Sequence, residues 1–347
     1  MQISNNMQIS FRGLMDPNIL ITGASGYIGT NLVHDLTTRG YNCIVNSRRP
    51  ERIEYLKRVV ENVNKEKVDK ALCSFVNLEL LKPNEIAQVL KNNAPIDAVV
   101  HLAGASLNAE SRINPRKYYD NNVGGTLNLV DTMLDNDVRR MVFISTGSTY
   151  GKVDMVPVDE QIKQNPETPY SRTKYIVEQI LKDYETHGLN PMILRLFNVA
   201  GARTNDDIEI GRNFISVLME KIKTGSLFTL MGGDYPTKDK TCVKDFLHVI
   251  DACNAIGLSV KKLLEDGAGN VYNLGSGIGT SLGEIIHKSQ EISGRQLQLR
   301  ITDGVPTETP ALVVDNTKIC NELDWEPQFD INDILKSSWE WTLNNGN

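Results

Sequence analysis

The stretch Asn18-Ile-Leu-Ile-Thr-Gly-Ala-Ser-Gly-Tyr-Ile-Gly29 decides how this chain folds. Its apolar beginning, residues 19–22, is typical of a strand that is covered on both faces. Gly23, Gly26 and Gly29 follow with the spacing Gly-x-x-Gly-x-x-Gly. In such a turn the first glycine permits the tight reversal. The second lets a pyrophosphate approach the backbone at the start of a helix, and the third lets that helix pack closely on the strand.

Ser25 lies inside this turn, and we expect it to cap the following helix or to donate to a phosphate. A glycine-rich turn can also exist without any ligand, so the glycine triplet alone is weak evidence for a cofactor site. Its place after a predicted strand and before a predicted helix, residues 27–39, strengthens the signal. The stretch therefore predicts a nicotinamide dinucleotide as the ligand.

Composition sets broad limits on the function. The 347 residues are enough for one large α/β domain with an appended lobe, or for two domains. Apolar residues make up 40% and charged residues 23%, as in ordinary globular proteins, and no apolar run is long enough to cross a bilayer. The net charge of -6 argues against nucleic acid as the main partner.

The cysteines point to a reducing compartment. There are 5 of them, an odd count, and no two form a Cys-x-x-Cys pair. This pattern fits free thiols in the cytoplasm better than a disulfide framework, and it predicts no metal site. The five are Cys43, Cys73, Cys242, Cys253 and Cys320.

Strands and helices are expected to alternate along residues 17–203. This alternation predicts an α/β fold with a Rossmann-like, doubly wound parallel sheet and right-handed crossovers. The expected strands are residues 19–22, 42–46, 71–76, 98–102, 141–145 and 192–197. The expected helices are residues 27–39, 51–67, 84–92, 116–134 and 170–187.

The regular alternation weakens after residue 203. We expect a smaller C-terminal substrate-binding lobe, made of residues 204–242 and 276–347, with a helix at 213–224. Segments within 243–275 are expected to return to the first domain, with short strands at 243–248 and 271–273. Residues 1–16 are interpreted as a flexible leader, or as lying upstream of the true start, because Met-Gln-Ile-Ser occurs at residue 1 and again at residue 7.

Residues suited to acid–base chemistry follow the strand at 141–145. Ser145-Thr-Gly-Ser-Thr-Tyr-Gly151 ends that strand, and Tyr170-Ser-Arg-Thr-Lys174 opens the next helix. Residues four apart share a helix face, so the ammonium is expected to lower the pKa of the phenol and make it an acid–base group. Thr146 or Ser148 can orient a carbinol or carbonyl oxygen. Tyr-x-x-x-Lys is common on amphipathic helices, but with the glycine turn and the hydroxyl cluster it indicates hydride transfer at a carbinol carbon.

With these motifs the sequence resembles the extended short-chain dehydrogenases/reductases, and among them the UDP-glucose 4-epimerase type of nucleotide-sugar enzyme. The resemblance extends from Pro17 to Trp341. Besides the glycine turn, its markers are His101-Leu-Ala-Gly104, Tyr118-Tyr-Asp-Asn-Asn-Val123, Ser145 to Gly151, Tyr170-x-x-x-Lys174, Leu194-Arg-Leu-Phe-Asn198, Gly233-Asp-Tyr-Pro-Thr237, Lys244-Asp-Phe-Leu-His248, Tyr272-Asn-Leu-Gly275 and Glu322-Leu-Asp-Trp325.

The resemblance implies roles for individual residues. The catalytic residues would be Thr146, Tyr170 and Lys174. Residues binding NAD or NADP would be Gly23, Ser25, Gly26, Tyr27, Ile28, Gly29, Ser47, Arg48, Asn77, Leu78, Leu102, Ala103, Gly104, Asn121, Tyr170, Lys174 and Phe197. Residues contacting a nucleotide-sugar substrate would be Ser148, Asn198, Asn213 and Lys244. It also implies a homodimer that pairs through the helices at 116–134 and 170–187.

The sequence departs from the family at several of these positions. The acidic residue that binds the adenosine ribose in the family is replaced by Ser47, which Arg48 and Arg49 follow. A hydroxyl and guanidinium groups suit the 2′-phosphate of NADP, although the two arginines can also be a solvated charge run. Two substrate-binding arginines of the family are Lys244 and Val305 here, and lysine lacks the fork geometry of arginine.

Comparison of this sequence with the motifs of related enzymes limits the possible reactions and substrates. Leu196 replaces a tyrosine of the family, so UDP-galactose itself is in doubt as substrate. Nucleotide-sugar 4,6-dehydratases need an acidic pair where this chain has Gly147 and Ser148, and fucose-synthase-like enzymes need a Cys/His pair that no segment supplies. The leading hypothesis is a nucleotide-sugar 4-epimerase. The alternatives are an NADPH-dependent 4-ketosugar reductase and a non-catalytic cofactor-sensing protein.

Overall fold

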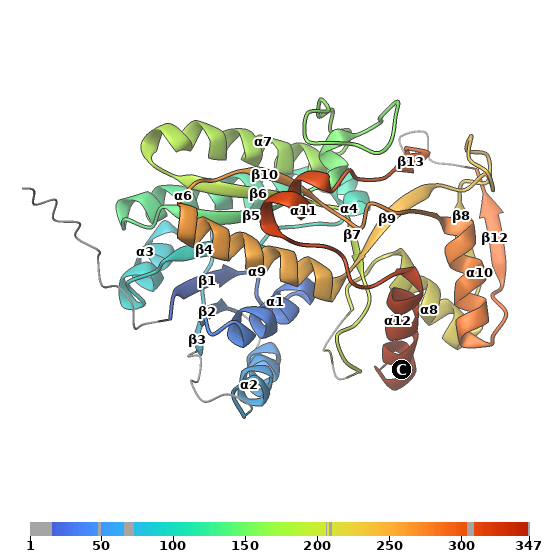
Figure 1. Cartoon of the computed structure of the whole chain (residues 1–347), viewed down its shortest axis with the longest axis horizontal. Helices are drawn as coiled ribbons and strands as arrows, with labels where there is room; N and C mark the ends of the chain where they lie inside the picture. The colour runs from blue at the N-terminus through green and yellow to red at the C-terminus, as the bar shows by residue number, and fades with distance from the viewer. Residues whose placement is uncertain are drawn as a thin grey trace, which may run out of the picture.

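A seven-stranded parallel sheet lies at the centre of the molecule (Figure 1). The computed structural model describes residues 16–47, 50–65, 73–205, 207, 210–303 and 309–345. The expected leader up to residue 15, and also Arg48, Arg49 and Val305, lie outside these ranges. The strand order is β10-β6-β5-β4-β1-β2-β3, which confirms the doubly wound sheet. The strands are β1 (Asn18–Thr22), β2 (Asn42–Asn46), β3 (Cys73–Val76), β4 (Ala98–His101), β5 (Arg140–Thr146), β6 (Asn190–Leu196) and β10 (Val271–Leu274).

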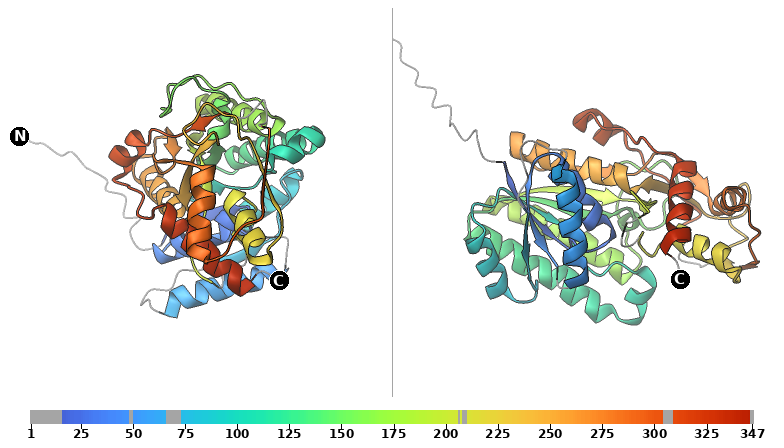
Figure 2. Two further views of the ribbon diagram at one scale, coloured as in Figure 1. Left: turned by 90° about the vertical axis from the view of Figure 1, so that its right-hand side faces the viewer. Right: turned by 90° about the horizontal axis from the view of Figure 1, so that it is seen from below.

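Helices cover both faces of this sheet (Figure 2). Side chains alternate along β1, so that Ile19 and Ile21 belong to one core cluster and Leu20 to another. The first face carries α1 (Tyr27–Thr38), α2 (Pro50–Lys65), α9 (Val249–Asp266) and α11 (Thr317–Leu323). The second face carries α3 (Pro83–Asn92), α6 (Gly125–Asp135) and α7 (Pro169–Tyr184). Burial on both faces explains the near-continuous apolar strands of the sequence.

The helix expected at residues 116–134 is present over residues 115–135, but it contains a π-helical turn that the sequence-based prediction did not include. The structure has α4 (Asn108–Ile113), α5 (Pro115–Tyr118) and a π-helical turn (Tyr119–Gly124) before α6. Pro115 occupies the first position of α5, where its missing amide hydrogen costs nothing, and Asn114 caps it. The π turn makes tertiary contacts with α7, which a one-dimensional pattern does not reveal.

The second lobe is built around a small mixed sheet. Strand β9 (Val243–His248) pairs with β7 (Asn198–Ala200), β11 (Gly279–Ser281) and β13 (Ala311–Leu312). The second lobe also contains a two-stranded sheet, formed by β8 (Phe228–Met231) and β12 (Leu299–Thr302). Its helices are α8 (Phe214–Thr224), α10 (Leu282–Ser293) and α12 (Ile331–Asn345). Residues 243–248, expected to return to the first domain, pair in the small sheet, although Leu247 packs in the core cluster of the large sheet. Strand β10 does return to the large sheet.

The C-terminal segment is divided between the two parts. Ile319, Leu323 and Trp325 pack in the same core cluster as the first strand, although residues 276–347 were assigned to the second lobe. The remainder of that segment packs around α8 and α10, where Trp339 is buried. Long-range packing rather than chain order thus decides which core each part joins.

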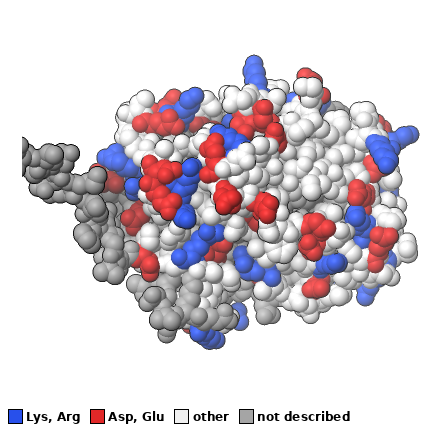
Figure 3. All heavy atoms as spheres, in the orientation of Figure 1, with Lys and Arg blue, Asp and Glu red and all other residues white. Residues whose placement is uncertain are grey.

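Acidic and basic side chains are interspersed on the face shown in Figure 3, with no extended patch of one sign. All five cysteines are free thiols. Within the described part of the chain, no helix combines the length and apolar character that crossing a membrane requires. The same residues contain no group of three or more His, Cys, Asp or Glu side chains that could hold a metal ion.

Candidate active site

The carboxyl ends of the parallel strands share one edge of the sheet, and the predicted cofactor residues follow these ends. Gly23 follows β1, Ser47 follows β2, Asn77 follows β3, Leu102 follows β4 and Phe197 follows β6. Ligands of doubly wound sheets bind beyond this edge, where the strand order reverses. The reversal lies between β1 and β4, which are neighbours. The glycine turn after β1 therefore marks the centre of the candidate site.

Close approach of backbone segments explains the glycines of this turn. Gly23 has a φ of +73°, and a Cβ there would lie 2.7 Å from the backbone nitrogen of Ala103, in the loop after β4. A Cβ on Gly29 would lie 2.4 Å from the carbonyl oxygen of Gly23, so α1 could not pack on the turn. A Cβ on Gly26 would be 3.4 Å from that oxygen, an ordinary contact. Gly26 thus leaves room outside the turn, where a pyrophosphate can approach.

The beginning of α1 is not capped by a side chain. Gly26 is the N-cap residue, and no side-chain cap hydrogen bond is present. Ser25 therefore does not cap the helix, and of its two expected roles only donation to a phosphate stays a prediction. The uncapped amides and the positive end of the helix dipole favour an anion at this position.

Tyr27 connects the glycine turn to the loop after β7. Its hydroxyl donates a 2.6 Å hydrogen bond to the carbonyl oxygen of Gly201, and a Cβ on Gly211 would lie 2.7 Å from its ring. Burial raises the pKa of Tyr27 well above its ordinary value, so the hydroxyl stays a donor. Ile28 is partly buried against the main core. Both side chains thus pack against the main core beside the turn.

Asn122 holds the loop after β4 in place. Its Oδ1 accepts a 2.8 Å hydrogen bond from the Ala105 amide, and its Nδ2 donates to the Ala105 carbonyl and to Thr173 Oγ1, both at 3.0 Å. A Cβ on Gly104 would lie 3.0 Å from Asn122 Oδ1. The predicted Asn121 is exposed, and its amide donates back to its own helical segment. The π turn thus directs Asn122 into the protein and Asn121 outward.

The candidate catalytic side chains meet at the end of β5. The hydroxyl of Thr146, the last residue of β5, lies 3.1 Å from that of Ser148. Tyr170, in the first turn of α7, lies close enough to Thr146 for the threonine side chain to lower its pKa. Lys174 follows one turn later, and its ammonium donates a 2.7 Å hydrogen bond to the carbonyl oxygen of Ile144. The structure therefore brings the predicted hydroxyl, phenol and ammonium groups to one place.

Burial is the main cause of the pKa shifts of Tyr170 and Lys174. It raises the pKa of Tyr170 to about 12, and the nearby Thr146 side chain opposes the rise. Burial also lowers the pKa of Lys174 to about 8, and Glu178 opposes the decrease. The lower pKa expected for Tyr170 is not found, because the ammonium is directed to a backbone carbonyl and to the ring of Phe143, 4.5 Å away.

Phe197 forms the wall beside the candidate catalytic side chains. A Cβ on Gly147 would lie 2.6 Å from the ring of Phe197, so the ring packs directly on the backbone that follows Thr146. Phe197 is 8% exposed and shares a small core cluster with Tyr150 and Val158. Because β6 is the neighbour of β5, this wall is fixed by the register of the two strands.

The ends of β2 and β3 form the outer part of the edge. Ser47 is buried, Asn77 is exposed and Leu78 is buried. Asn46 donates from Nδ2 to the Leu78 carbonyl at 3.2 Å and accepts at Oδ1 from the Leu78 amide at 3.1 Å. This two-point contact holds Ser47 and the Asn77–Leu78 pair beside each other, at the position where the resemblance places adenosine.

Of the four predicted substrate residues, Ser148 follows β5, and the other three lie on elements of the second lobe. Asn198 on β7 is exposed, and its amide donates to the Asp245 carbonyl at 2.8 Å. Lys244 on the neighbouring β9 is half-buried. Asn213 caps α8, because its Oδ1 accepts from the Ser216 amide at 2.9 Å and its Nδ2 donates to the Val199 carbonyl at 3.1 Å. This gives Asn213 a structural role that the sequence-based prediction did not include.

Asp245 joins β9 to the loop after β10. Its buried carboxylate accepts hydrogen bonds from the amide and the hydroxyl of Ser276, both at 2.8 Å, from the Gly277 amide at 3.0 Å and from the Val314 amide at 3.3 Å. Burial raises the pKa of Asp245, and these hydrogen bonds oppose the rise. Because side chains alternate along a strand, the adjacent Lys244 faces away from this buried carboxylate.

Sequence reasoning missed several buried polar residues that position the site. Asn46 ends an apolar strand, and Asn122 stands beside the predicted Asn121. Glu178 follows Lys174 at helical spacing, and Arg195 interrupts the apolar β6. A polar residue within an apolar run is the signal that could have found them, since buried polar groups need partners.

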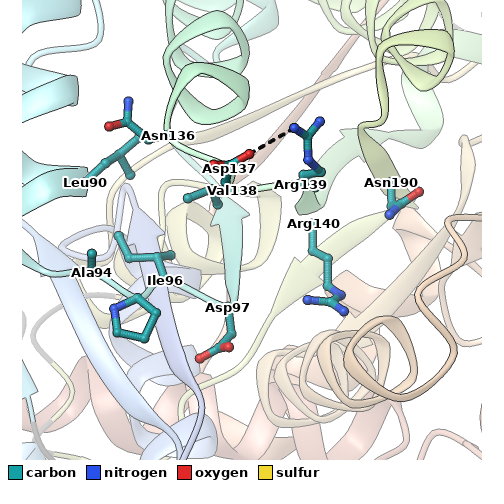
Figure 4. Close-up of a pocket in the computed structure, with 11 residues that line it drawn as sticks. Leu90, Ala94, Ile96, Asp97, Asn136, Asp137, Val138, Arg139, Arg140 and Asn190 are labelled. Atoms are coloured by element: carbon teal, nitrogen blue, oxygen red, sulfur yellow. Dashed lines mark hydrogen bonds and ion pairs between the residues drawn. The ribbon is translucent and has the colours of Figure 1, made fainter. Parts of the chain in front are cut away.

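A pocket of about 430 Å³ lies at the opposite edge of the sheet (Figure 4). Its lining includes Asp97, Arg139 and Asn190, which lie where β4, β5 and β6 begin. Arg139 pairs there with Asp137 at 3.1 Å. No predicted site residue lines this pocket, and ligands of such sheets bind at the carboxyl edge. We therefore place the active site at the carboxyl edge.

The fold and the site define a nucleotide-binding α/β enzyme, and comparison with known proteins gives its family. Residues 19–275 match the NAD dependent epimerase/dehydratase family. The chain is 35% identical over 340 residues to a UDP-glucose 4-epimerase of Rhizobium meliloti (strain 1021), which covers 94% of this chain and 98% of the relative. The chain therefore belongs to this family, which confirms the resemblance found in the sequence.

Other relatives agree. A bifunctional UDP-glucose 4-epimerase and UDP-xylose 4-epimerase of Arabidopsis thaliana is 31% identical, covering 95% of this chain and 97% of the relative. A UDP-glucose 4-epimerase from Stenotrophomonas maltophila, solved with NAD and formylated UDP-arabinopyranose, superposes with a TM-score of 0.85 at 29% identity, covering 94% of this chain and 98% of that one. The UDP-glucose 4-epimerase from Brucella ovis, solved with NAD, superposes with a TM-score of 0.83 at 29% identity. The superposition covers 93% of this chain and 97% of that one.

We expect Tyr170→Phe to reduce turnover by at least ~100-fold, because a phenylalanine cannot exchange a proton with substrate. Cofactor affinity should stay nearly intact, since the ring and its packing are kept. Steady-state kinetics and calorimetry would measure the two effects. Tyr175→Phe, on the same helix, is the matched control and should be active. Unchanged turnover in Tyr170→Phe would remove Tyr170 from the mechanism.

Proposed function

We propose that this protein is a nucleotide-sugar 4-epimerase that acts by transient oxidation at the sugar 4-hydroxyl. The single observation that carries this proposal is the meeting of Thr146, Tyr170 and Lys174 at the end of β5, two strands from the glycine turn. In its ionised, phenolate form Tyr170 takes the proton of the 4-hydroxyl and later returns it, while Thr146 orients the same oxygen. Three relatives that are 32–35% identical over nearly the whole chain are UDP-glucose 4-epimerases, which supports this function.

The residues of the carboxyl edge fit a nicotinamide dinucleotide. The space outside Gly26 and the uncapped start of α1 suit its pyrophosphate, and the Ser47 and Leu78 region suits its adenosine. When bound, this cofactor would supply the hydride acceptor and donor. Phe197 would shield the reacting end from water, because its ring closes the wall against Gly147. Lys174 would provide a positive charge beside the reacting oxygen.

The proposed function is tested by incubating the full-length protein with UDP-glucose, UDP-galactose and other nucleotide hexoses. We expect interconversion at C4 without net consumption of cofactor, followed by proton NMR, and a nicotinamide dinucleotide identified by mass spectrometry in the purified protein. Failure to interconvert any nucleotide hexose would contradict the epimerase function. Stoichiometric oxidation of NADPH with a nucleotide 4-ketosugar would instead establish the reductase.

One observation favours the reductase as a second candidate. The residue that follows β2 is Ser47 rather than an acidic residue, and Arg48 and Arg49 come next in the sequence. An acidic side chain at this position would repel a 2′-phosphate, whereas a charge-assisted hydrogen bond from arginine is roughly twice as strong as a neutral one. We infer that NADP(H) binds at least as well as NAD(H), although the compared epimerase structures carry NAD.

We expect Arg48→Ala to weaken NADP(H) and to leave NAD(H) nearly unchanged, because only NADP(H) carries the 2′-phosphate. Calorimetry on the apo protein would measure both affinities. Arg58→Ala, an exposed arginine on α2, removes the same charge elsewhere and is the matched control. If NAD(H) binds far more tightly and Arg48→Ala affects both cofactors alike, Arg48 is a surface charge.

We also infer a two-fold symmetric homodimer that pairs through α6 and α7. The outer face of α7 carries the half-buried Ile176 and Ile180, and Tyr184 at its end donates a 2.6 Å hydrogen bond to Asp131 of α6. The two helices thus form one surface with apolar side chains, as an isologous contact requires. Sedimentation at micromolar concentration should give twice the chain mass, and a monomer there would refute the dimer.

A further inference from the structure

Glu178 and Arg195 form a buried ion pair directly behind the catalytic residues. Arg195 on β6 donates to Glu178 Oε2 on α7 from Nε at 3.1 Å and from Nη2 at 2.9 Å. The two side chains are 2% and 8% exposed. Two charges removed from water cost several kcal/mol each unless they are well paired. Such a pair needs a reason beyond stability.

The pair is connected to the residues that carry the chemistry. Ser145, which precedes Thr146, donates its hydroxyl hydrogen bond to Glu178 Oε1. Lys174 lies one helical turn before Glu178, and its ammonium donates to the carbonyl oxygen of Ile144, the residue before Ser145. Glu178 and Lys174 therefore hold consecutive residues at the end of β5.

Arg195 is in turn held by neutral partners. Its Nη1 donates to the Tyr150 hydroxyl at 2.9 Å, and its Nη2 donates to Gln164 Oε1 at 2.9 Å. Gln164 also donates to Glu178 Oε2 at 2.9 Å. The separation between the guanidinium and the carboxylate is thus fixed from several sides, and so is the field that the pair exerts on its surroundings.

Apart from Glu178, the described groups that face the ammonium of Lys174 from the neighbouring elements are neutral. On β4, burial and the charge of Lys174 lower the pKa of His101 to about 3, so its imidazole is neutral. From β5 the ring of Phe143 faces the ammonium, and on α7 Tyr170 is a neutral phenol. The carboxylate of Glu178 is the anion that opposes the effect of burial on the pKa of Lys174. Arg195 on β6 is the cation paired with that anion.

We propose that the buried Glu178–Arg195 pair is an electrostatic support for the catalytic lysine. Glu178 keeps the ammonium of Lys174 charged in its desolvated position, and Arg195 limits how much of the carboxylate's charge Lys174 experiences. Both are positioning residues, because they act through Lys174 and Thr146 rather than on substrate. The proposal rests on the proposed function only for the consequence that turnover depends on a charged Lys174.

An ion pair that merely crosslinks α7 to β6 would behave differently when its two charges are removed one at a time. Loss of either partner of a crosslink weakens the same contact and changes the site in the same direction. Loss of either partner of an electrostatic support moves the charge state of Lys174 in opposite directions. Opposite charges within a few ångströms shift a pKa by about 1–3 units, which is large enough to measure.

The test compares Glu178→Gln with Arg195→Gln in the full-length protein. The pKa of Lys174 would be measured by NMR titration of protein labelled with ¹³C at lysine Cε, the resonance being assigned by its absence in Lys174→Met. We expect Glu178→Gln to lower this pKa by at least about one unit, because the anion is lost and an unbalanced guanidinium is left. Arg195→Gln should raise it, because the carboxylate is no longer neutralised.

Ser145→Ala is the matched control, since it removes a hydrogen bond to Glu178 without changing any charge, and it should leave the pKa of Lys174 within a few tenths of a unit. If Glu178→Gln does not fold, Arg195→Gln alone decides the question through the direction of its shift. No shift in a folded variant, or shifts of the same sign in both, would overturn the proposal. The titration needs no turnover, so a negative titration result is distinguishable from failure of the proposed function.

If the wild-type protein is an active epimerase, the alkaline limb of its pH–rate profile should move with the pKa of Lys174 in each variant.

Discussion

The approach of the turn after β1 to the loop after β4 is the constraint on which the rest of the structure depends. A Cβ on Gly23 would lie 2.7 Å from the Ala103 nitrogen, and one on Gly29 would lie 2.4 Å from the Gly23 oxygen. Backbone therefore packs on backbone at the reversal point of the sheet, with α1 directed at the same spot. Because β5 and β6 continue the sheet from β4, Thr146 and Phe197 are placed relative to this turn by strand register.

The charged side chains buried near the end of β5 do not contribute to stability in the way that this close backbone packing does. Lys174, Glu178 and Arg195 are all largely removed from water, and pairs of this kind are often no more stable than apolar side chains of similar volume. The proposed role in positioning Lys174 accounts for their presence, because a desolvated ammonium responds strongly to each neighbouring charge. The site is therefore expected to be a place where stability is given up for function.

The two parts of the molecule share elements rather than meeting as separate domains. Strand β9 belongs to the small sheet, whereas α9, which follows it directly, packs in the core of the large one. The Tyr27 hydroxyl binds the carbonyl of Gly201, and α11 returns to the large core after β13. Inter-lobe contacts of this kind fix the proposed substrate residues Asn198 and Lys244 relative to the cofactor edge.

Local patterns in the sequence were sufficient to determine the glycine turn, the alternation of strands and helices and the Tyr170–Lys174 spacing. Residues 42–46 were predicted as a strand with the bounds the structure has, because an apolar run between two polar segments defines it locally. The π turn that directs Asn122 inward, the pairing of β9 with β7 and the raised pKa of Tyr170 were decided only by the tertiary structure. Each depends on groups far apart in the chain, such as Ala105, Thr173 and Asp245, and on desolvation, which exists only once the chain has packed.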